Sequence, residues 1–328
     1  MIKEKFKPNT GLTLIEILIG IIVSSIMMAA IYTTYSIVNT TYNQVLEKAK
    51  VSRSSRDLIE LLIRDARMAG YKYYLGTNNL GFPSQSNLQF LTGGTRIWES
   101  HDPIIIEKDT LGHDIRDPDG YTRPTKNNLI QGQVDACCDK IHFVYDDFDH
   151  LDENQPYKRY RVTYFADIET DGTEQNPTNQ RYAVFKSKIA WEQSLNQTTG
   201  DWNPNCPTCY DRELIKDYVE DMEFIPLDKN GRVLSPYPSP RTEDARRNLY
   251  KVRAIDMRIA FVSEKPFFKF ERGQGNPRQI SGFTRNIKSY TDRNLRESVV
   301  VTVYTRNVVE KNIYSVSYTH LRAHETRP

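Results

Sequence analysis

The feature that most constrains this chain is an apolar run near its N-terminus, residues 12–31, which holds a single acidic residue, Glu16. A helix needs about 20 apolar residues to cross a bilayer, so this run is long enough to span one. Placing a carboxylate in lipid costs a free energy of a few kcal/mol at least. A carboxylate found there is therefore expected to have a function and a partner. The run predicts a membrane-spanning helix in which Glu16 has a specific role.

Residues 1–11 form a short basic leader with three lysines and one glutamate. An ordinary signal peptide also starts with basic residues, but here the apolar run is long and no small-x-small cleavage site follows it. A plain membrane anchor with its positive flank inside also fits the charges. Neither alternative explains Glu16. Cleavage after Gly11 does, because Leu12 becomes the N-terminus and Glu16 then lies about one helical turn from a free amine.

The sequence G-L-T-L-I-E, residues 11–16, resembles the type IV prepilin signature, in which Phe is commoner than Leu12. The resemblance implies cleavage by prepilin peptidase between Gly11 and Leu12, and methylation of the amine of Leu12. It also implies that Glu16 guides assembly by pairing with the N-terminal amine of an adjacent subunit. The partners implied are the peptidase, other major and minor pilins, and an inner-membrane assembly platform. The protein is then expected in the inner membrane as a single-pass protein before assembly, and in a pilus or periplasmic pseudopilus afterwards.

The absence of proline between residues 12 and 70 predicts one helix over 12–69, about 87 Å long at about 1.5 Å per residue. Gly70 is suited to cap its C-terminus and Arg67 to its last turn. The second half is amphipathic, so we expect one face to pack on a domain. The residues of that face are Val45, Ala49, Leu58, Leu62, Ala66 and Ala69.

The end of this helix resembles PilW-like minor pilins and the related type II secretion pseudopilin J. The shared pattern is Asp-x-Arg-Met-Ala-Gly-Tyr, here Asp65, Arg67, Met68, Ala69, Gly70 and Tyr71. The resemblance implies a non-enzymatic minor pilin that primes pilus assembly, or a pseudopilin of a secretion machine. A membrane-anchored binding or redox protein that uses its cysteines is the alternative of another class.

Beyond residue 70 the chain alternates apolar and polar residues, which predicts antiparallel strands and, with the long helix, an α+β fold. The resemblance to type IV prepilins implies that this fold is pilin-like. Asn230 and Gly231 are a strong hairpin signal. Residues 71–136 are rich in Asn, Gly, Asp and Pro, and we expect loops there. The β-rich domain is expected over 70–315, with strands at 140–146, 159–165, 181–189, 252–262 and 297–307.

The last residues, 316–328, read VSYTHLRAHETRP and resemble the translation of a sequencing adapter. We expect this tail to be an artefact that takes no part in the fold, although a genuine C-terminal tail is the alternative.

The four cysteines are Cys137, Cys138, Cys206 and Cys209. Disulfides are expected in an exported protein, and three pairings are open. Cys206-x-x-Cys209 also resembles a redox motif, but its flanks predict a loop rather than the start of a helix. A zinc site of all four is disfavoured because adjacent cysteines depart from the usual ligand spacing.

Other chemistry has little support in the sequence. Residues 167–174, DIETDGTE, partly resemble a calcium loop, but Thr178 stands where a glutamate is required, so a polar turn is expected. No nucleophile elbow, phosphate-binding loop or H-E-x-x-H motif occurs, and no cofactor or metal is expected. The leader alone carries a net charge of +2, as much as the whole chain, so the basic balance does not indicate nucleic-acid binding.

Overall fold

The computed structural model describes residues 13–71, 102–108, 137–148, 150–151, 157–173, 176–193, 200–240, 242–273, 277–280, 282 and 288–308. The chain divides into two compact units, Met1–Lys50 and Val51–Pro328. Gly11, Leu12, most of residues 71–136 and the tail at 316–328 lie outside the described residues.

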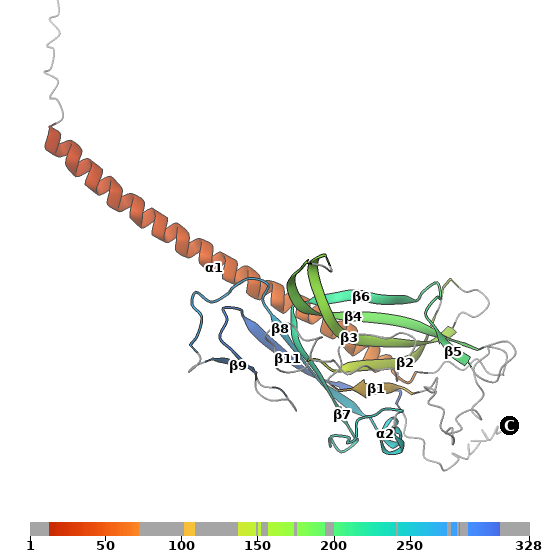
Figure 1. The fold of residues 1–328 in the computed structure, drawn as a ribbon. Helices are drawn as coiled ribbons and strands as arrows, with labels where there is room; N and C mark the ends of the chain where they lie inside the picture. The colour runs from red at the N-terminus through yellow and green to blue at the C-terminus, as the bar shows by residue number, and fades with distance from the viewer. Residues whose placement is uncertain are drawn as a thin grey trace, which may run out of the picture. The chain divides into compact units, whose positions relative to one another are not determined.

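One helix, α1 (Leu14–Met68), accounts for the first unit and enters the second (Figure 1). It confirms the predicted long helix. An 18-residue window of it has a mean hydropathy of 2.5 and is not buried at all, so this segment is long and apolar enough to cross a membrane.

The buried face of α1 begins later than the sequence predicts. Val45 and Ala49 are exposed, which corrects the predicted face, because the hydrophobic core of the second unit reaches back only to Val51. From there, buried residues recur at intervals of three and four, as expected of a helix with one covered face. They are Val51, Ser55, Leu58, Leu62, Asp65, Ala66 and Ala69.

The larger sheet is antiparallel and consists, among the described residues, of six strands. Its order is β1-β2-β3-β4-β5, and β6 also pairs with β4. The bounds are β1 (Ile104–Glu107), β2 (Lys140–Phe148), β3 (Tyr157–Thr173), β4 (Asn176–Gln193), β5 (Gly200–Asn203) and β6 (Tyr210–Asp217).

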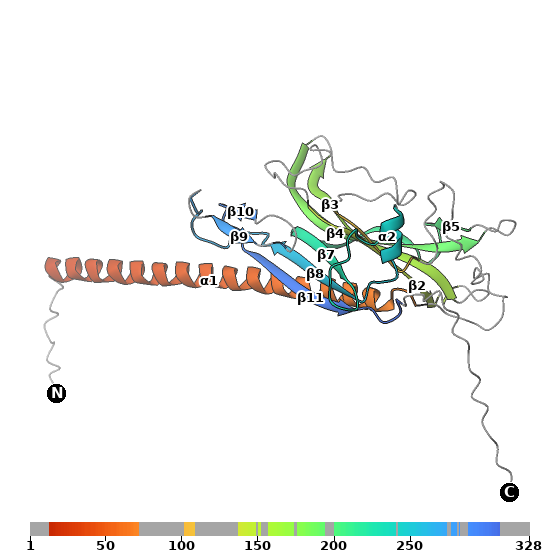
Figure 2. The ribbon, with the colours of Figure 1, turned by 90° about the horizontal axis from the view of Figure 1, so that it is seen from below.

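A second antiparallel sheet has the order β11-β8-β7, from β7 (Val219–Leu227), β8 (Ala254–Val262) and β11 (Arg296–Tyr304). Between β8 and β11 the chain forms a two-stranded ribbon, β9 (Arg278–Ile280) and β10 (Lys288–Tyr290). The short helix α2 (Glu243–Asn248) is capped by the Thr242 hydroxyl, which accepts from the Ala245 amide. Figure 2 shows β11 running alongside the last turns of α1.

One hydrophobic core joins the covered face of α1 to both sheets. It contains Leu58 and Leu62 from the helix, Phe143 from β2 and Met257 from β8, all 2% exposed or less. Along a strand, the residues of this core tend to occupy every second position, because successive side chains point to opposite faces of a sheet. Helix and antiparallel sheets therefore form the predicted α+β fold.

Three details differ from or refine the prediction. Part of the expected loop region, residues 104–107, is the strand β1, because it pairs with β2 and is fully covered. Residues 167–173 continue β3 instead of forming a polar turn, since they pair with β4 as far as Asn176. The chain does reverse at Asn230 and Gly231, but the returning arm makes one bridge, between Leu227 and Val233, rather than a strand.

Candidate functional site

Glu16 lies in the first turn of α1, where it completes a cap with Thr13. Its Oε2 accepts from the Thr13 amide at 2.8 Å and from the Thr13 hydroxyl at 2.9 Å. The Glu16 amide in turn donates to Thr13 Oγ1 at 3.4 Å. This reciprocal pattern is a capping box, which satisfies donors that the helix start leaves unpaired. Both bonds to the carboxylate end on Oε2, so Oε1 is positioned to accept from another donor.

Six hydroxyl groups in the first half of α1 are satisfied by the helix itself. Ser25 donates to the Ile21 carbonyl at 2.7 Å, and Thr34 donates to the Ala30 carbonyl at 2.9 Å. Ser24, Thr33, Thr40 and Thr41 make equivalent bonds to carbonyls three or four residues earlier. Such bonds remove the cost of placing a hydroxyl in lipid. From Leu14 to Ile31, Glu16 is then the one charged group.

Apolar side chains cover the first half of α1 on every side. Leu14 is 82% exposed and Met28 is 72% exposed, and the residues between them are also exposed. A helix that is apolar all round is suited to lipid or to packing among other helices, not to water. This half of α1 is therefore long and apolar enough to cross a membrane.

At its other end, α1 is fixed to the larger sheet by a buried carboxylate, Asp65. Tyr164 donates its hydroxyl to Oδ2 at 2.6 Å, and Tyr145 donates to Oδ1 at 3.2 Å. The ammonium of Lys186 lies 2.9 Å from Oδ2, and the Arg64 guanidinium lies 3.2 Å from Oδ1. Asp65 itself is 0% exposed. A charge buried this completely is tolerated because it is both paired and hydrogen-bonded.

The two tyrosines around Asp65 act as permanent donors. Burial raises the pKa of Tyr164 far above its usual value, and the negative charge of Asp65 raises it further. Burial and then the same carboxylate also raise the pKa of Tyr145. Both hydroxyls therefore keep their protons in the neutral pH range and remain donors to Asp65.

The chain leaves α1 through a tight junction at Gly70, which has a φ of +80°. Its amide donates to the Val144 carbonyl at 2.8 Å, and the Tyr71 amide donates to the Met68 carbonyl at 2.9 Å. A Cβ on Gly70 would lie 2.9 Å from the carbonyl oxygen of Asn307. The side-chain amide of Asn307 also donates to the Arg67 carbonyl at 3.0 Å. Gly70 is thus required by its conformation and by this close approach.

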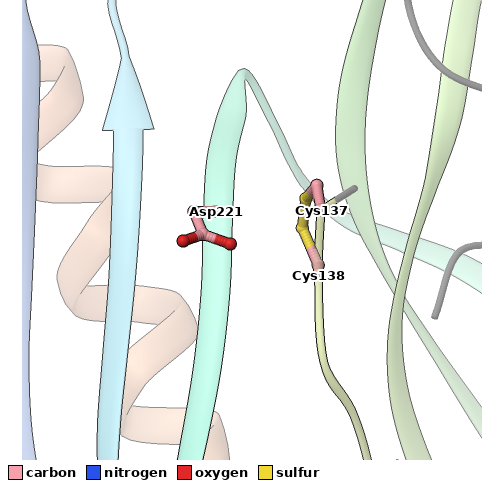
Figure 3. Close-up of side chains that lie close together, drawn as sticks. All are labelled: Cys137, Cys138 and Asp221. Atoms are coloured by element: carbon pink, nitrogen blue, oxygen red, sulfur yellow. A yellow bond between two sulfur atoms is a disulfide. The ribbon is translucent and has the colours of Figure 1, made fainter. Parts of the chain in front are cut away.

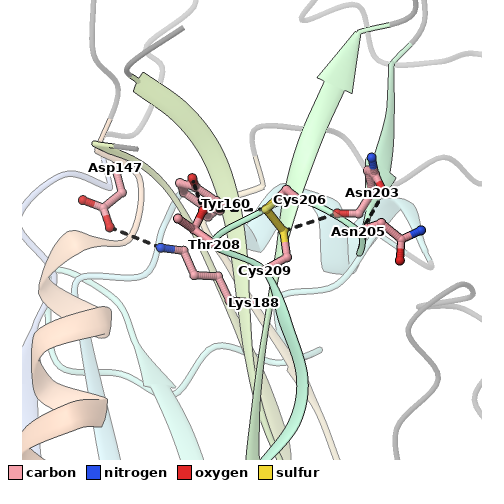
Figure 4. The surroundings of a disulfide bond; sticks show 8 residues. All are labelled: Asp147, Tyr160, Lys188, Asn203, Asn205, Cys206, Thr208 and Cys209. Carbon is pink, nitrogen blue, oxygen red and sulfur yellow. Dashed lines mark hydrogen bonds and ion pairs between the residues drawn. A yellow bond between two sulfur atoms is a disulfide. The ribbon is translucent and has the colours of Figure 1, made fainter. Parts of the chain in front are cut away.

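Cys206 and Cys209 form a disulfide in the loop between β5 and β6 (Figure 4). The Tyr160 hydroxyl lies 2.8 Å from that of Thr208, inside the same loop. A strand rather than a helix follows Cys209. The local bridge was one of the pairings left open. It links two residues within the loop, and Cys206 packs with Tyr160 of β3 and Ala190 of β4. The setting does not provide the helix start that lowers the pKa of a redox cysteine.

Cys137 and Cys138 also form a disulfide, just before β2, and both are fully buried (Figure 3). Their sulfur atoms and an Asp221 carboxylate oxygen lie within 4.8 Å of one another, a grouping that resembles a metal site. The sulfurs are bonded to each other, however, and Asp221 accepts from Arg258 at 3.1 Å. With each cysteine pair closed locally, the predicted alternative of a four-cysteine zinc site is not formed. Metal ligation requires thiolates.

The residues that resembled a calcium loop have another role. Arg212 forms an ion pair with Asp167, and its other terminal nitrogen lies 3.6 Å from Glu169. These carboxylates connect β3 to β6 across the sheet instead of surrounding a cation.

Sequence reasoning identified Glu16 and Gly70 and named Asp65 only within the helix-end pattern. It missed the groups that contact these three residues. The pattern T-x-x-E at residues 13–16 is a signal for the cap at Thr13. The partners of Asp65 come from β2, β3 and β4, and no local pattern announces them. Gly11 and Leu12 lie outside the described residues, so their roles stay predictions.

Comparison with known proteins adds evidence at the N-terminus. The family model named prokaryotic N-terminal methylation motif matches residues 6–32. No curated protein matches the chain. Among solved structures, a type IV-like pilin from Thermus thermophilus is similar over 80% of this chain and 100% of its own, with 9% identity and a TM-score of 0.34. That similarity is too remote to bear on function.

Proposed function

We propose that this chain, which carries the N-terminal methylation motif of type IV prepilins, is a minor pilin of the PilW-like kind. One observation carries the proposal: the motif coincides with the start of a helix that is apolar on all sides and holds one carboxylate in its first turn. The motif belongs to structural subunits, which supports the expectation of a protein that is not an enzyme.

Processing would supply the missing partner of Glu16. Cleavage between Gly11 and Leu12 creates an amine directly before Thr13, the residue that caps Glu16. Oε2 is engaged by Thr13. Oε1 would accept from a second donor, and a protonated or methylated amine of an adjacent subunit is suited to this. A charge pair in lipid recovers much of the cost of burying the carboxylate. The pair would therefore form preferentially where subunits meet.

The exposed apolar half of α1 would then hold the subunit in the assembly. Helices that leave lipid and pack side by side gain dispersion contacts along their whole length. Prepilin peptidase, other pilins and the inner-membrane platform are the proposed partners. The proposed location is the inner membrane before assembly and the pilus afterwards, where this subunit primes assembly.

A type II secretion pseudopilin J would be processed in the same way. A deletion strain separates the two machines: loss of pili or twitching supports the minor pilin, and loss of protein secretion supports the pseudopilin.

The processing step is tested by co-expressing the full chain with an active prepilin peptidase and measuring the mass of the N-terminal peptide. We expect a peptide that begins at methylated Leu12, and an intact leader with a catalytically inactive peptidase as control. Glu16→Gln should leave cleavage unchanged while incorporation into pili falls at least about tenfold, since the charge pair is lost. An intact leader with the active enzyme, or cleavage beyond residue 30, would refute the proposal.

A further inference from the structure

The connection between β8 and β11 folds into an ordered lobe, defined here as the described residues of 263–295. Backbone bonds close it: the amides of Phe267 and Phe268 both donate to the Arg293 carbonyl at 2.8 Å. Side chains attach it to the sheet, since Tyr290 donates to Glu220 of β7 at 2.6 Å and Arg296 of β11 donates to Asp292 at 2.6 Å. The lobe is therefore a fixed surface rather than a loose loop.

This lobe presents an aromatic side chain among cations. Phe270 is 72% exposed, the largest exposure among the large apolar residues beyond α1, together with Tyr304. The ammonium of Lys269 lies 5.5 Å from its ring centroid, and the Arg278 guanidinium lies 3.7 Å above the Phe268 ring. Within the lobe, six Lys and Arg residues outnumber three acidic ones. The charged residues are Glu264, Lys265, Lys269, Glu271, Arg272, Arg278, Lys288, Asp292 and Arg293.

The lobe lies at the end of the β domain where α1 enters it. The side chain of Asn307, after β11, contacts the Arg67 carbonyl at the end of α1. The strand β11 begins at Arg296, so this residue lies at the other end of the strand from the contact with the end of α1. Both ribbon views show β9 beyond the start of β11, on the side away from β2 (Figures 1 and 2). The lobe is thus on the side of the domain from which the apolar half of α1 is reached along the chain.

We infer that this lobe is a docking surface for the anionic lipid headgroups of the membrane in which α1 is anchored. Lysines near an anionic bilayer are attracted by its surface potential, and aromatic rings favour the headgroup region. The inference rests on the proposed membrane anchoring, because α1 would tether the domain that carries the lobe to that membrane. Docking would hold the domain against the membrane until the subunit is extracted into the filament.

The test uses the full chain in vesicles of phosphatidylcholine alone or with about one third phosphatidylglycerol. Phe270→Trp reports contact with the bilayer through quenching by brominated lipids, measured as the difference from the parent chain. Val300→Trp is the matched control, since Val300 is 53% exposed in the same domain but outside the lobe. Flotation of the protein with the vesicles measures anchoring by α1 separately.

We expect the indole introduced by Phe270→Trp to be quenched in the anionic vesicles and several-fold less in the neutral ones, with little quenching of the control. Adding Lys265→Glu and Lys269→Glu to this reporter variant should lower its quenching about tenfold, because each lysine contributes to attraction by anionic lipid.

Three outcomes would contradict the inference. Equal quenching of the Phe270→Trp variant in both vesicle types would contradict docking of the lobe to anionic lipid. Quenching no greater than that of the Val300→Trp control, in a protein that floats with the vesicles, would also contradict it. A fluorescence response of the Phe270→Trp variant to soluble polyphosphate but not to vesicles also overturns it, in favour of a soluble polyanion. Failure to float overturns the anchoring instead.

Discussion

The contact between Asp65 and Lys186 should be among the strongest single interactions that hold α1 on the sheet. Their charged atoms lie 2.9 Å apart, and the two side chains are 1% and 6% exposed. Removing one partner of a buried pair costs about 3–5 kcal/mol, because the other charge stays buried without compensation. Asp65→Asn should therefore lower the free energy of unfolding by about that amount. Lys186→Met should cost less, about 1–3 kcal/mol, because two tyrosine hydroxyls still donate to Asp65.

The double variant, Asp65→Asn with Lys186→Met, removes both charges and should lose less than the two single losses combined. We expect a coupling energy of at least about 2 kcal/mol from the cycle. The assay is equilibrium denaturation of the full chain in detergent, followed by tryptophan fluorescence. Arg247 and Glu243 form a matched control, since they lie closer, at 2.6 Å, but are 64% and 81% exposed. Their coupling should be below about 0.5 kcal/mol. A buried pair that couples no more than this exposed one would refute the reasoning.

Three further perturbations follow from the same structure. Gly70→Ala should cost at least about 1 kcal/mol more than Gly231→Ala in denaturation, because both need a positive φ but only Gly70 has an atom within 4 Å of the new Cβ. Replacing both Cys206 and Cys209 with serine should lower the free energy of unfolding by about 2 kcal/mol, the value for a short loop, and an unchanged midpoint would contradict this. Burial alone would raise the pKa of Asp292, but hydrogen bonds and charge from Arg296 outweigh it and lower that pKa. Its stabilisation is therefore present at neutral pH and lost as the pH falls below about 4, so the melting temperatures of the parent and Asp292→Asn should converge there.

The sequence predicts well what local pattern determines. The apolar run, the lack of proline and the glycine at 70 specify the long helix and its end, and alternation locates five of the strands. Prediction was poorest where tertiary contacts decide. Val45 has the right spacing for the buried face, yet it is exposed, and the core residues of α1 begin at Val51. Residues 167–173 look like a turn by composition, but pairing with β4 makes them a strand.

In the candidate site, too, some residues are evident from local pattern and others depend on tertiary contacts. Glu16 stands out in the sequence because a carboxylate in an apolar run is conspicuous by itself. Asp65 is not conspicuous, since it occurs among other charges on an amphipathic helix. Its burial depends on Tyr145, Tyr164 and Lys186, which lie 80 or more residues away along the chain. The lobe at 263–295 was missed for a similar reason, because its order comes from bonds to Glu220 and to its own backbone.

The contact between Asn307 and the end of α1 can form only late in the synthesis of the chain. The two partners, Arg67 and Asn307, are 240 residues apart, and β11 is the last described strand to cover the helix. At about 5–20 residues per second, the ribosome needs roughly 10–50 s to make the intervening chain. Throughout that interval the apolar stripe of Leu58, Leu62 and Ala66 has no complete cover. The buried stripe of α1 is thus synthesised before every described strand that covers it, and its cover is completed only once β11 has been made.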